Sequence, residues 1–195
     1  MIAGPRLVLF ARYPVAGACK TRLIPALGAE GAAALHRHLT ERTIATLRQS
    51  GYRVTLAYTG AEEAAFAAWF GRDIVLVEQV EGDLTAKLMA CIDPAPVIFF
   101  GADTPDLKLH HVEQAIAALQ THDVVIGPAD DGGYYLIGMR TPLPQLLTDM
   151  PWSTDRVLPE TLARLGQLEI EPAILETLSD CDRPEDLARW PDLTA

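Results

Sequence analysis

The sequence lacks long apolar runs and carries little positive charge. No segment approaches the 18 or more consecutive apolar residues of a membrane span, and the chain does not start with a basic leader and an apolar core. The formal net charge is −10 and only three lysines occur in 195 residues, so the broad basic surface typical of nucleic-acid binding is missing. We therefore expect a cytoplasmic protein that binds neither nucleic acid nor membrane.

Cysteine is also scarce. The three cysteines, Cys19, Cys91 and Cys181, are odd in number, far apart in sequence and without a C-x-x-C pair. This pattern favours neither a disulfide framework nor a zinc site, and it predicts three reduced thiols.

The two common phosphate-binding fingerprints are missing as well. The loop after the first predicted strand, YPVAGACKTRL, has a single glycine, Gly17, and matches neither G-x-G-x-x-G nor G-x-x-x-x-G-K-[ST]. The loop nevertheless gathers the positive charges of Arg12, Lys20 and Arg22 in an acidic protein. Because backbone N–H groups and cations in such loops share the phosphates of ligands, we predict an anion site here. The alternative is a solvated basic loop.

Hydrophobic residues make up 49% of the chain, which is enough for one domain over residues 1–195. Strand and helix patterns alternate, which predicts a three-layer, Rossmann-like α/β fold with a mainly parallel sheet. We expect strands at 6–12, 53–59, 74–79, 97–100, 123–129, from 134 onward and within 168–178. We expect helices at 29–49, 61–70, after Gly82, at 107–119, at 150–165 and from Pro184.

The stretch VIFFGADTPDL, residues 97–107, is the predicted centre of the sheet. Four apolar strand formers in a row indicate a strand that is buried on both faces, as in a parallel sheet. Asp103 then lies at the carboxyl end of this strand, where α/β folds bind their ligands, and is well placed to hold a metal ion on a phosphate. The alternative is that Asp103 caps the helix that begins near Asp106.

A second acidic turn follows the strand at 123–129. It contains Asp130, Asp131, Gly132 and Gly133 and leads into a returning strand at Tyr134. Asp-Gly alone is explained by a plain hairpin. The extra aspartate and the second glycine favour an acceptor pocket, in which the bare backbone approaches a ligand and Tyr134 lines the wall.

Two pairs of histidines lie on predicted helices. His36 and His38 are two positions apart and do not face one another, so we assign both to the surface. His110 and His111 are adjacent and are expected to point in divergent directions, so we expect no shared metal there.

The start of the last long helix leaves alternatives open. Ser153, Thr154 or Asp155 is expected to cap it, and Pro159 either kinks it or lies in its first turn. Trp152 either packs in the core or lines a pocket.

Four segments together resemble one family. They are FARYPVAGACKTRL, GADTPDL, GPADDGGYYLIGM with PWSTDRVLPETL, and DCDRPEDL. In this order they are similar to the bacterial radical-SAM/selenodomain-associated transferases of type 1, which resemble the glycosyltransferase-A fold of the nucleotide-diphospho-sugar transferases. The resemblance runs from about residue 6 to 190. The chain departs from the family at Arg12, where Lys is frequent, and at Arg183, where Thr is usual.

The resemblance implies a metal-dependent enzyme with a nucleotide donor. Asp103 would match the metal aspartate of the family's G-x-D motif, and Asp182 would supply a second contact to Mg²⁺ or Mn²⁺, with Asp180 as the competing assignment. Lys20 and Arg22 would neutralise the leaving phosphate, and Asp130 or Asp131 would orient the hydroxyl of a small-molecule acceptor or act as its base. The residues expected to contact the donor or acceptor are Arg12, Gly17, Lys20, Arg22, Gly132, Gly133 and Tyr134.

Three functions remain in competition at this point. The first is a nucleotide-sugar glycosyltransferase. The second is a nucleotidyltransferase of the guanylyl- or cytidylyltransferase kind, which joins an NTP to a phosphorylated or carboxylated acceptor, and the third is a nucleotide-binding module without turnover. The single glycine of the first loop disfavours the second, because nucleotidyltransferases usually carry a richer glycine motif there. The two aspartates and the basic loop disfavour the third. Fold alone does not decide between them.

Overall fold

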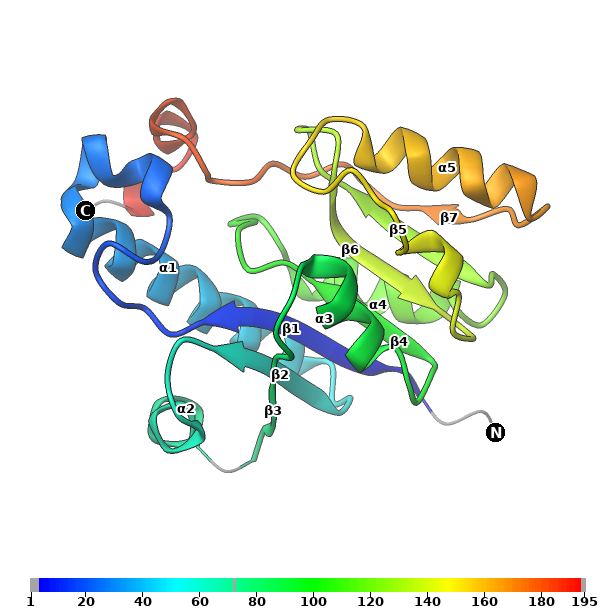
Figure 1. Cartoon of the computed structure of the whole chain (residues 1–195), viewed down its shortest axis with the longest axis horizontal. Coiled ribbons are helices and arrows are strands. Elements are labelled where there is room, and N and C mark those ends of the chain that lie inside the picture. Colours follow the sequence, from blue (N-terminus) through cyan, green and yellow to red (C-terminus); the bar gives the residue numbers. More distant parts are fainter. Residues whose placement is uncertain (1–3, 72, 194–195) are drawn as a thin grey trace.

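A seven-stranded sheet lies between two layers of helices in the computed structural model, which describes residues 4–71 and 73–193 (Figure 1). The strand order is β3-β2-β1-β4-β6-β5-β7, and every neighbouring pair is parallel except the pairs that involve β6. This confirms the predicted α/β fold with a mainly parallel sheet. The strands are β1 Arg6–Arg12, β2 Val54–Thr59, β3 Val75–Glu78, β4 Val97–Phe100, β5 Val124–Pro128, β6 Tyr134–Met139 and β7 Ala173–Ile174.

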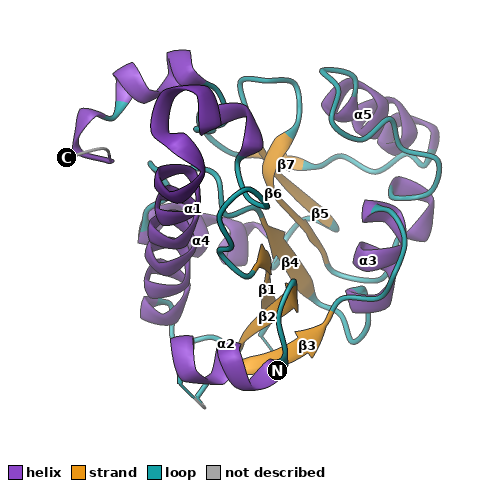
Figure 2. Cartoon of the chain, turned by 60° about the vertical axis from the view of Figure 1, so that its left-hand side comes forward, coloured by secondary structure: helices purple, strands orange, loops and turns teal. Residues whose placement is uncertain are grey.

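The helices divide between the two faces of the sheet, as Figure 2 shows. One apolar core lies between the sheet and α1, α2 and α4, and a second lies between the sheet and α3 and α5. Two separate cores on opposite faces of one sheet define the three-layer arrangement. The helices are α1 Ile24–Gln49, α2 Glu63–Phe70, α3 Leu84–Cys91, α4 Leu109–Ala118 and α5 Val157–Gln167, with short 3₁₀ turns at Thr21–Leu23, Pro144–Leu146, Pro184–Arg189 and Pro191–Leu193.

Strand β4 lies where the apolar run predicted it. All four of its residues are buried, and it pairs with β1 in parallel and with β6 in antiparallel register. Asp103 therefore does follow the carboxyl end of a central strand. The antiparallel β5–β6 hairpin ends at the same edge of the sheet, which brings the acidic turn to the side where the β1 and β4 loops emerge.

One predicted helix start is confirmed and another is wrong. Helix α1 begins at Ile24 but is interrupted at Gly28, whose φ of 70° is not helical, so the regular helix begins at the predicted position 29. Helix α5 begins only at Val157 with Arg156 as its N-cap, so the predicted caps are wrong. Pro159 falls in the first turn of α5, where the missing N–H has no helical partner to lose.

The C-terminal segment closes the carboxyl edge of the sheet. In Figure 1 it runs back across the molecule to the start of α1. There Cys181 is buried with Leu23 and Leu39 in a third apolar cluster, against which Leu187 and Trp190 pack.

Among the described residues, no helix is both long and apolar enough to cross a membrane. The extent of the domain over the full residues 1–195 stays a prediction.

Candidate active site

Lys20 is the centre of the candidate site. It ends the loop after β1 in a left-handed conformation, with φ 43° and ψ 48°, and such strained non-glycine residues cluster at functional sites. Its side chain is only 4% exposed, and its Nζ lies 2.6 Å from Asp103 Oδ1, 3.1 Å from Asp182 Oδ1 and 2.7 Å from the carbonyl oxygen of Cys181. The structure therefore brings together three residues that the sequence predicted separately.

The charges of this cluster support one another. Burial by itself lowers the pKa of Lys20, but the carboxylates of Asp103 and Asp182 outweigh burial and raise it, so the ammonium stays charged. The two carboxylates are 43% and 41% exposed and thus remain accessible. The helix-cap alternative for Asp103 is wrong, because α4 begins at Leu109 with Lys108 as its N-cap.

A hollow of about 380 Å³ opens beside this cluster. Arg12 and Arg22 are exposed at its wall, and among the described residues neither guanidinium has a side-chain partner. Gly17 lies in the exposed part of the same loop with φ 80°, and no atom of the described part of the chain would lie within 4 Å of a methyl group on its Cα. The hollow is lined by Arg12, Ala18, Cys19, Lys20, Thr21, Arg22, His36, Asp103, Ser153 and Asp182.

His36 corrects one sequence prediction. It is buried rather than on the surface, and its Nε2 lies 2.9 Å from the carbonyl oxygen of Arg12. The bond joins α1 to the end of β1, and the imidazole forms part of the wall of the hollow. His38 is exposed, as predicted.

A second hollow of about 360 Å³ adjoins the first and shares Arg22, Ser153 and Asp182 with it. Its lining is strongly acidic. Ser153, with φ 63°, is a second left-handed residue at the site and was not singled out as a ligand-binding residue from the sequence. The lining residues are Arg22, Asp130, Asp131, Ser153, Thr154, Asp155, Asp180, Asp182, Arg183 and Asp186.

The two predicted catalytic aspartates differ in their surroundings. Asp130 Oδ2 accepts hydrogen bonds from Ser179 Oγ at 2.6 Å and from Arg189 Nη1 at 2.7 Å. Partial burial raises the pKa of Asp130, but these two bonds outweigh it and lower the pKa, which makes this carboxylate a poor base. Asp131 is exposed at the hollow, and from the residues that the structure describes it accepts only the Gly133 N–H, at 2.9 Å, so it is the better candidate of the two.

Gly132 corrects a second prediction. A Cβ at this position would lie 2.5 Å from both Cα and the carbonyl oxygen of Asp155. The close backbone approach that we expected toward a ligand is therefore made toward the segment before α5. The carbonyl of Gly132 also accepts the Leu158 N–H at 2.9 Å, which ties the hairpin to the start of that helix. Gly133 lies in the same turn, half-buried.

Tyr134 does not line either hollow. Its ring packs edge-on against Trp152 at 6.3 Å in the α3/α5 core, and its hydroxyl is buried near α5. Burial raises the pKa of Tyr134 far above its usual value, so the phenol stays neutral. Trp152 packs in the same core and donates from Nε1 to Thr85 Oγ1 at 2.8 Å, which places it in the core rather than in a pocket.

The sequence left open whether Asp180 or Asp182 is the metal ligand, and the structure shows that the two carboxylates have different surroundings. Thr104 Oγ1 donates to its carboxylate at 2.5 Å. Burial, together with the nearby carboxylates of Asp103, Asp131 and Asp182, raises the pKa of Asp180 to about 7 despite that bond. Asp182 contacts Lys20 and solvent, while Asp180 is half-buried in the lining of the second hollow and is bonded to Thr104.

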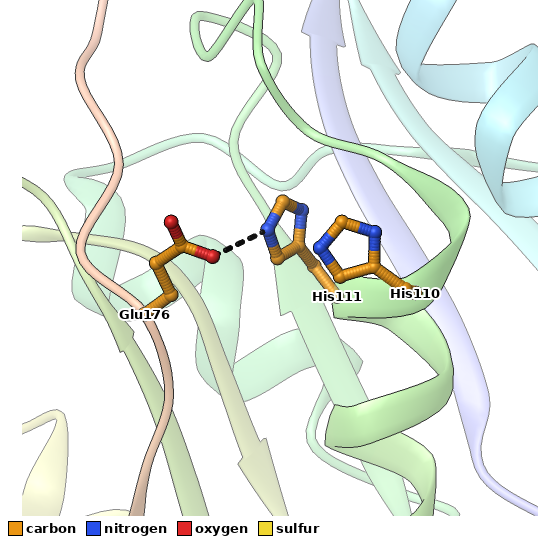
Figure 3. A group of neighbouring side chains, drawn as sticks. All are labelled: His110, His111 and Glu176. Atoms are coloured by element: carbon orange, nitrogen blue, oxygen red, sulfur yellow. Dashed lines mark hydrogen bonds and ion pairs between the residues drawn. The ribbon is translucent and has the colours of Figure 1, made fainter.

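A separate cluster at the start of α4 also departs from expectation. Figure 3 shows His110 and His111 side by side, with His111 aimed at Glu176, and the ring centroids of the two histidines are 3.9 Å apart. His111 Nδ1 accepts the Lys108 N–H at 3.0 Å, so in the neutral ring the proton sits on Nε2, which faces Glu176 Oε2 at 3.3 Å. A metal bound to Nε2 of His111 would require the ring proton to sit on Nδ1. Nδ1 cannot carry it while it accepts the Lys108 N–H. The rings therefore do converge, contrary to our expectation, but the hydrogen bonds of His111 oppose a metal.

The cap made by His111 predicts a pH-dependent stability. Burial lowers the pKa of His111, and His110 and Lys108 lower it further against the opposing effect of Glu176. The unfolded chain, with a histidine pKa of about 6.5, therefore takes up the proton first as the pH falls. His111 thus stabilises the protein above pH ~6.5, and this contribution is lost as the pH falls through the lower folded pKa.

The measurement is the free energy of unfolding in urea between pH 7.5 and 5.5, for the wild type and for His111→Gln. The wild type should lose more stability over this range than the variant. His38→Gln, at an exposed position, is the control and should keep the wild-type slope. Equal slopes for wild type and His111→Gln would contradict the proposed cap.

Comparison with protein families gives one match. The family described as "Uncharacterized protein conserved in bacteria (DUF2064)" matches residues 43–154, more than half of the chain. The chain belongs to the DUF2064 family. In this DUF2064 protein Asp103, Asp130 and Asp131 lie within the matched segment, while Lys20 and Asp182 flank it. A comparison with curated proteins gave no match.

Solved structures extend the comparison. This DUF2064 protein is 30% identical to a proposed nucleotide-diphospho-sugar transferase from Desulfovibrio desulfuricans G20, with a TM-score of 0.87 over 94% of this chain and 84% of that chain. Rv0371c from Mycobacterium tuberculosis H37Rv, in complex with manganese, is 18% identical, with a TM-score of 0.55 over 95% and 97%. CMP:2-keto-3-deoxy-manno-octonic acid synthetase complexed with CTP is 16% identical, with a TM-score of 0.57 over 97% and 98%.

These matches confirm the predicted superfamily, since the fold is that of the nucleotide-diphospho-sugar transferases. The two matches below 25% identity share the fold alone. The narrower resemblance to the radical-SAM/selenodomain-associated transferases stays a prediction, as does the cytoplasmic location.

Proposed function

We propose that this protein is a divalent-metal-dependent glycosyltransferase that takes a sugar from a nucleotide donor and passes it to a small-molecule acceptor. One observation carries the proposal: Lys20, Asp103 and Asp182 meet at the carboxyl edge of the sheet, between a hollow with two exposed arginines and an acidic hollow. The Desulfovibrio relative, itself a proposed nucleotide-diphospho-sugar transferase, supports the same class of reaction.

The residues present fit a divalent ion. Asp103 and Asp182 offer partly exposed carboxylate oxygens close to one another, and hard cations such as Mg²⁺ or Mn²⁺ prefer oxygen ligands. Bound there, the ion would neutralise the phosphates of the donor. A distant structural neighbour carries manganese and another carries CTP, which agrees with a metal and a nucleotide in this fold.

The chain's own residues divide the remaining tasks between the two hollows. Arg12 and Arg22 are exposed in the first hollow and can bind the donor diphosphate, whose departure places negative charge there. In the second hollow, Asp131 can accept the proton of an acceptor hydroxyl or fix its direction, while Ser153 and Thr154 offer further hydroxyl groups.

The charge of the second hollow favours sugar transfer over nucleotidyl transfer. Its lining contains six aspartates and only two arginines. A phosphorylated or carboxylated acceptor, as the nucleotidyltransferase alternative requires, would meet like charges there, which is costly at short range. A neutral polyhydroxy acceptor would instead find many hydrogen-bond acceptors for its hydroxyl groups.

The first step of a test of the donor class does not need the acceptor. For each base, the affinities of the nucleoside diphosphate and triphosphate are measured by calorimetry with Mn²⁺ present. We expect the diphosphate, the leaving group of sugar transfer, to bind about as well as the triphosphate. A clear triphosphate preference, followed by pyrophosphate release with a phosphorylated acceptor, would replace the proposal by the nucleotidyltransferase alternative. If the protein binds nucleotides but turns over no nucleotide sugar, the remaining alternative is the nucleotide-binding module.

A further inference from the structure

Lys20 has no hydrogen-bonding capacity left for a ligand. An ammonium group has three N–H donors, and here three oxygens surround it: Asp103 Oδ1, Asp182 Oδ1 and the carbonyl oxygen of Cys181. The side chain is almost completely covered, so solvent cannot supply a substitute partner. In this state Lys20 cannot bind a donor phosphate in the way that the sequence predicted.

The ammonium instead occupies the position of a cation between two carboxylates. These are the same carboxylates that the proposed function assigns to the divalent ion, and the inference rests on that assignment. We infer that Lys20 is an internal counter-ion that the metal must displace from Asp103 and Asp182. The displaced ammonium is then the group that binds donor phosphate.

The geometry around Lys20 supplies a place for the displaced ammonium. Its flexible four-carbon stem lets the charge move while the backbone stays fixed by the turn at Thr21–Leu23. The first hollow adjoins it and already contains Arg12 and Arg22. Donor phosphates in that hollow would offer new acceptors, so donor and metal each make the other's binding easier. Such coupling is reciprocal, as linkage requires.

A simpler arrangement competes with this inference. Each carboxylate has a second oxygen, and a metal bound only through those oxygens would leave Lys20 in place. The two arrangements make opposite predictions for the exposure of Lys20 once the metal is bound. If Lys20 is a competitor, its removal must tighten metal binding, and the bound metal must also free the ammonium from its cover. If Lys20 is a bystander, its removal can also tighten binding by relieving charge repulsion, but the ammonium stays covered when the metal binds.

The first experiment titrates Mn²⁺ alone into the wild type, Lys20→Met and Lys87→Met, with the electron paramagnetic resonance signal of free Mn²⁺ as readout. Lys87 lies on α3 outside both hollows and is the matched control. We expect Lys20→Met to bind Mn²⁺ at least about tenfold more tightly than the wild type, the factor that corresponds to one lost hydrogen bond between charged groups. Lys87→Met should match the wild type. Equal or weaker binding by Lys20→Met overturns the inference.

The second experiment needs no variant of Lys20 and therefore does not depend on how such a variant folds. The wild type is acetylated at its amines with and without Mn²⁺, and the extent at each lysine is read by peptide mass spectrometry. Lys20 should be almost unreactive without Mn²⁺ and react severalfold faster with it, while Lys87 and Lys108 stay constant. Unchanged or lower reactivity of Lys20 with bound Mn²⁺ overturns the inference.

The results separate this inference from the proposed function. If the wild type binds Mn²⁺ measurably and Lys20→Met binds it no better, the metal site stands and the counter-ion role fails. If neither protein binds Mn²⁺, with or without nucleoside diphosphate, both fail together.

Discussion

Asp103→Asn is expected to remove metal-dependent nucleotide binding and to lower turnover by roughly 10²-fold or more, while the chain stays folded. The variant replaces a charged oxygen ligand by a neutral amide of the same shape. The fold should persist because Lys20 keeps its contacts to Asp182 and to the carbonyl of Cys181. Mn²⁺ titration by calorimetry in the presence of nucleoside diphosphate measures the binding, and circular dichroism checks the fold.

Asp106→Asn is the matched control for this experiment. Asp106 lies three residues further along the same loop, but its carboxylate accepts the Trp190 Nε1–H at 2.9 Å and lines neither hollow. Its loss should leave Mn²⁺ affinity unchanged. If Asp103→Asn also retains wild-type Mn²⁺ affinity, Asp103 is not a metal ligand, and its role is the ion pair with Lys20.

Gly132→Ala is expected to lower the free energy of unfolding by roughly 2–4 kcal/mol. Two effects add. The φ of +90° at Gly132 is one that alanine adopts only with strain, and the new methyl group would lie 2.5 Å from the backbone of Asp155. Because backbone rather than a flexible side chain opposes the methyl, the hairpin and the segment before α5 must separate. Urea unfolding measures the loss.

Gly133→Ala tests this explanation at the neighbouring position. Among the described residues, a Cβ there would meet the side chain of Asp131 alone, with Oδ1 at 3.2 Å. This side chain can rotate away, at the cost of its exposed hydrogen bond to the Gly133 N–H. We expect this variant to cost less than about 1 kcal/mol. Similar losses for the two variants would show that the close approach to Asp155 is not what requires a glycine at 132.

The sequence was most informative where a short run of neighbouring residues is enough to show how that run is buried or charged. Four apolar residues in a row predicted the buried strand β4 and hence the position of Asp103. Clustered positive charge in a lysine-poor chain pointed to Lys20 and its loop. Both signals are local, so neither depends on knowing how distant segments meet.

The errors arose where a distant segment decides the environment. His36 was assigned to the surface by its spacing from His38, but the carbonyl of Arg12 binds it in the interior. Gly132 was expected to face a ligand, yet its neighbour is Asp155, more than twenty positions away. No spacing rule contains these contacts, since they follow from how α1 and α5 pack on the sheet.

The bond between Lys20 and the carbonyl of Cys181 also has a consequence for the order in which the protein is made. The two residues are 161 positions apart, and a ribosome completes the first long before the second. A nascent chain that has reached residue 178 holds every strand of the sheet, but its Lys20 has only one of its two carboxylates. The proposed metal site would therefore form only after Cys181 and Asp182 have been made. Removal of the segment after β7, which carries Asp182, would abolish the proposed metal site while every strand of the sheet remains.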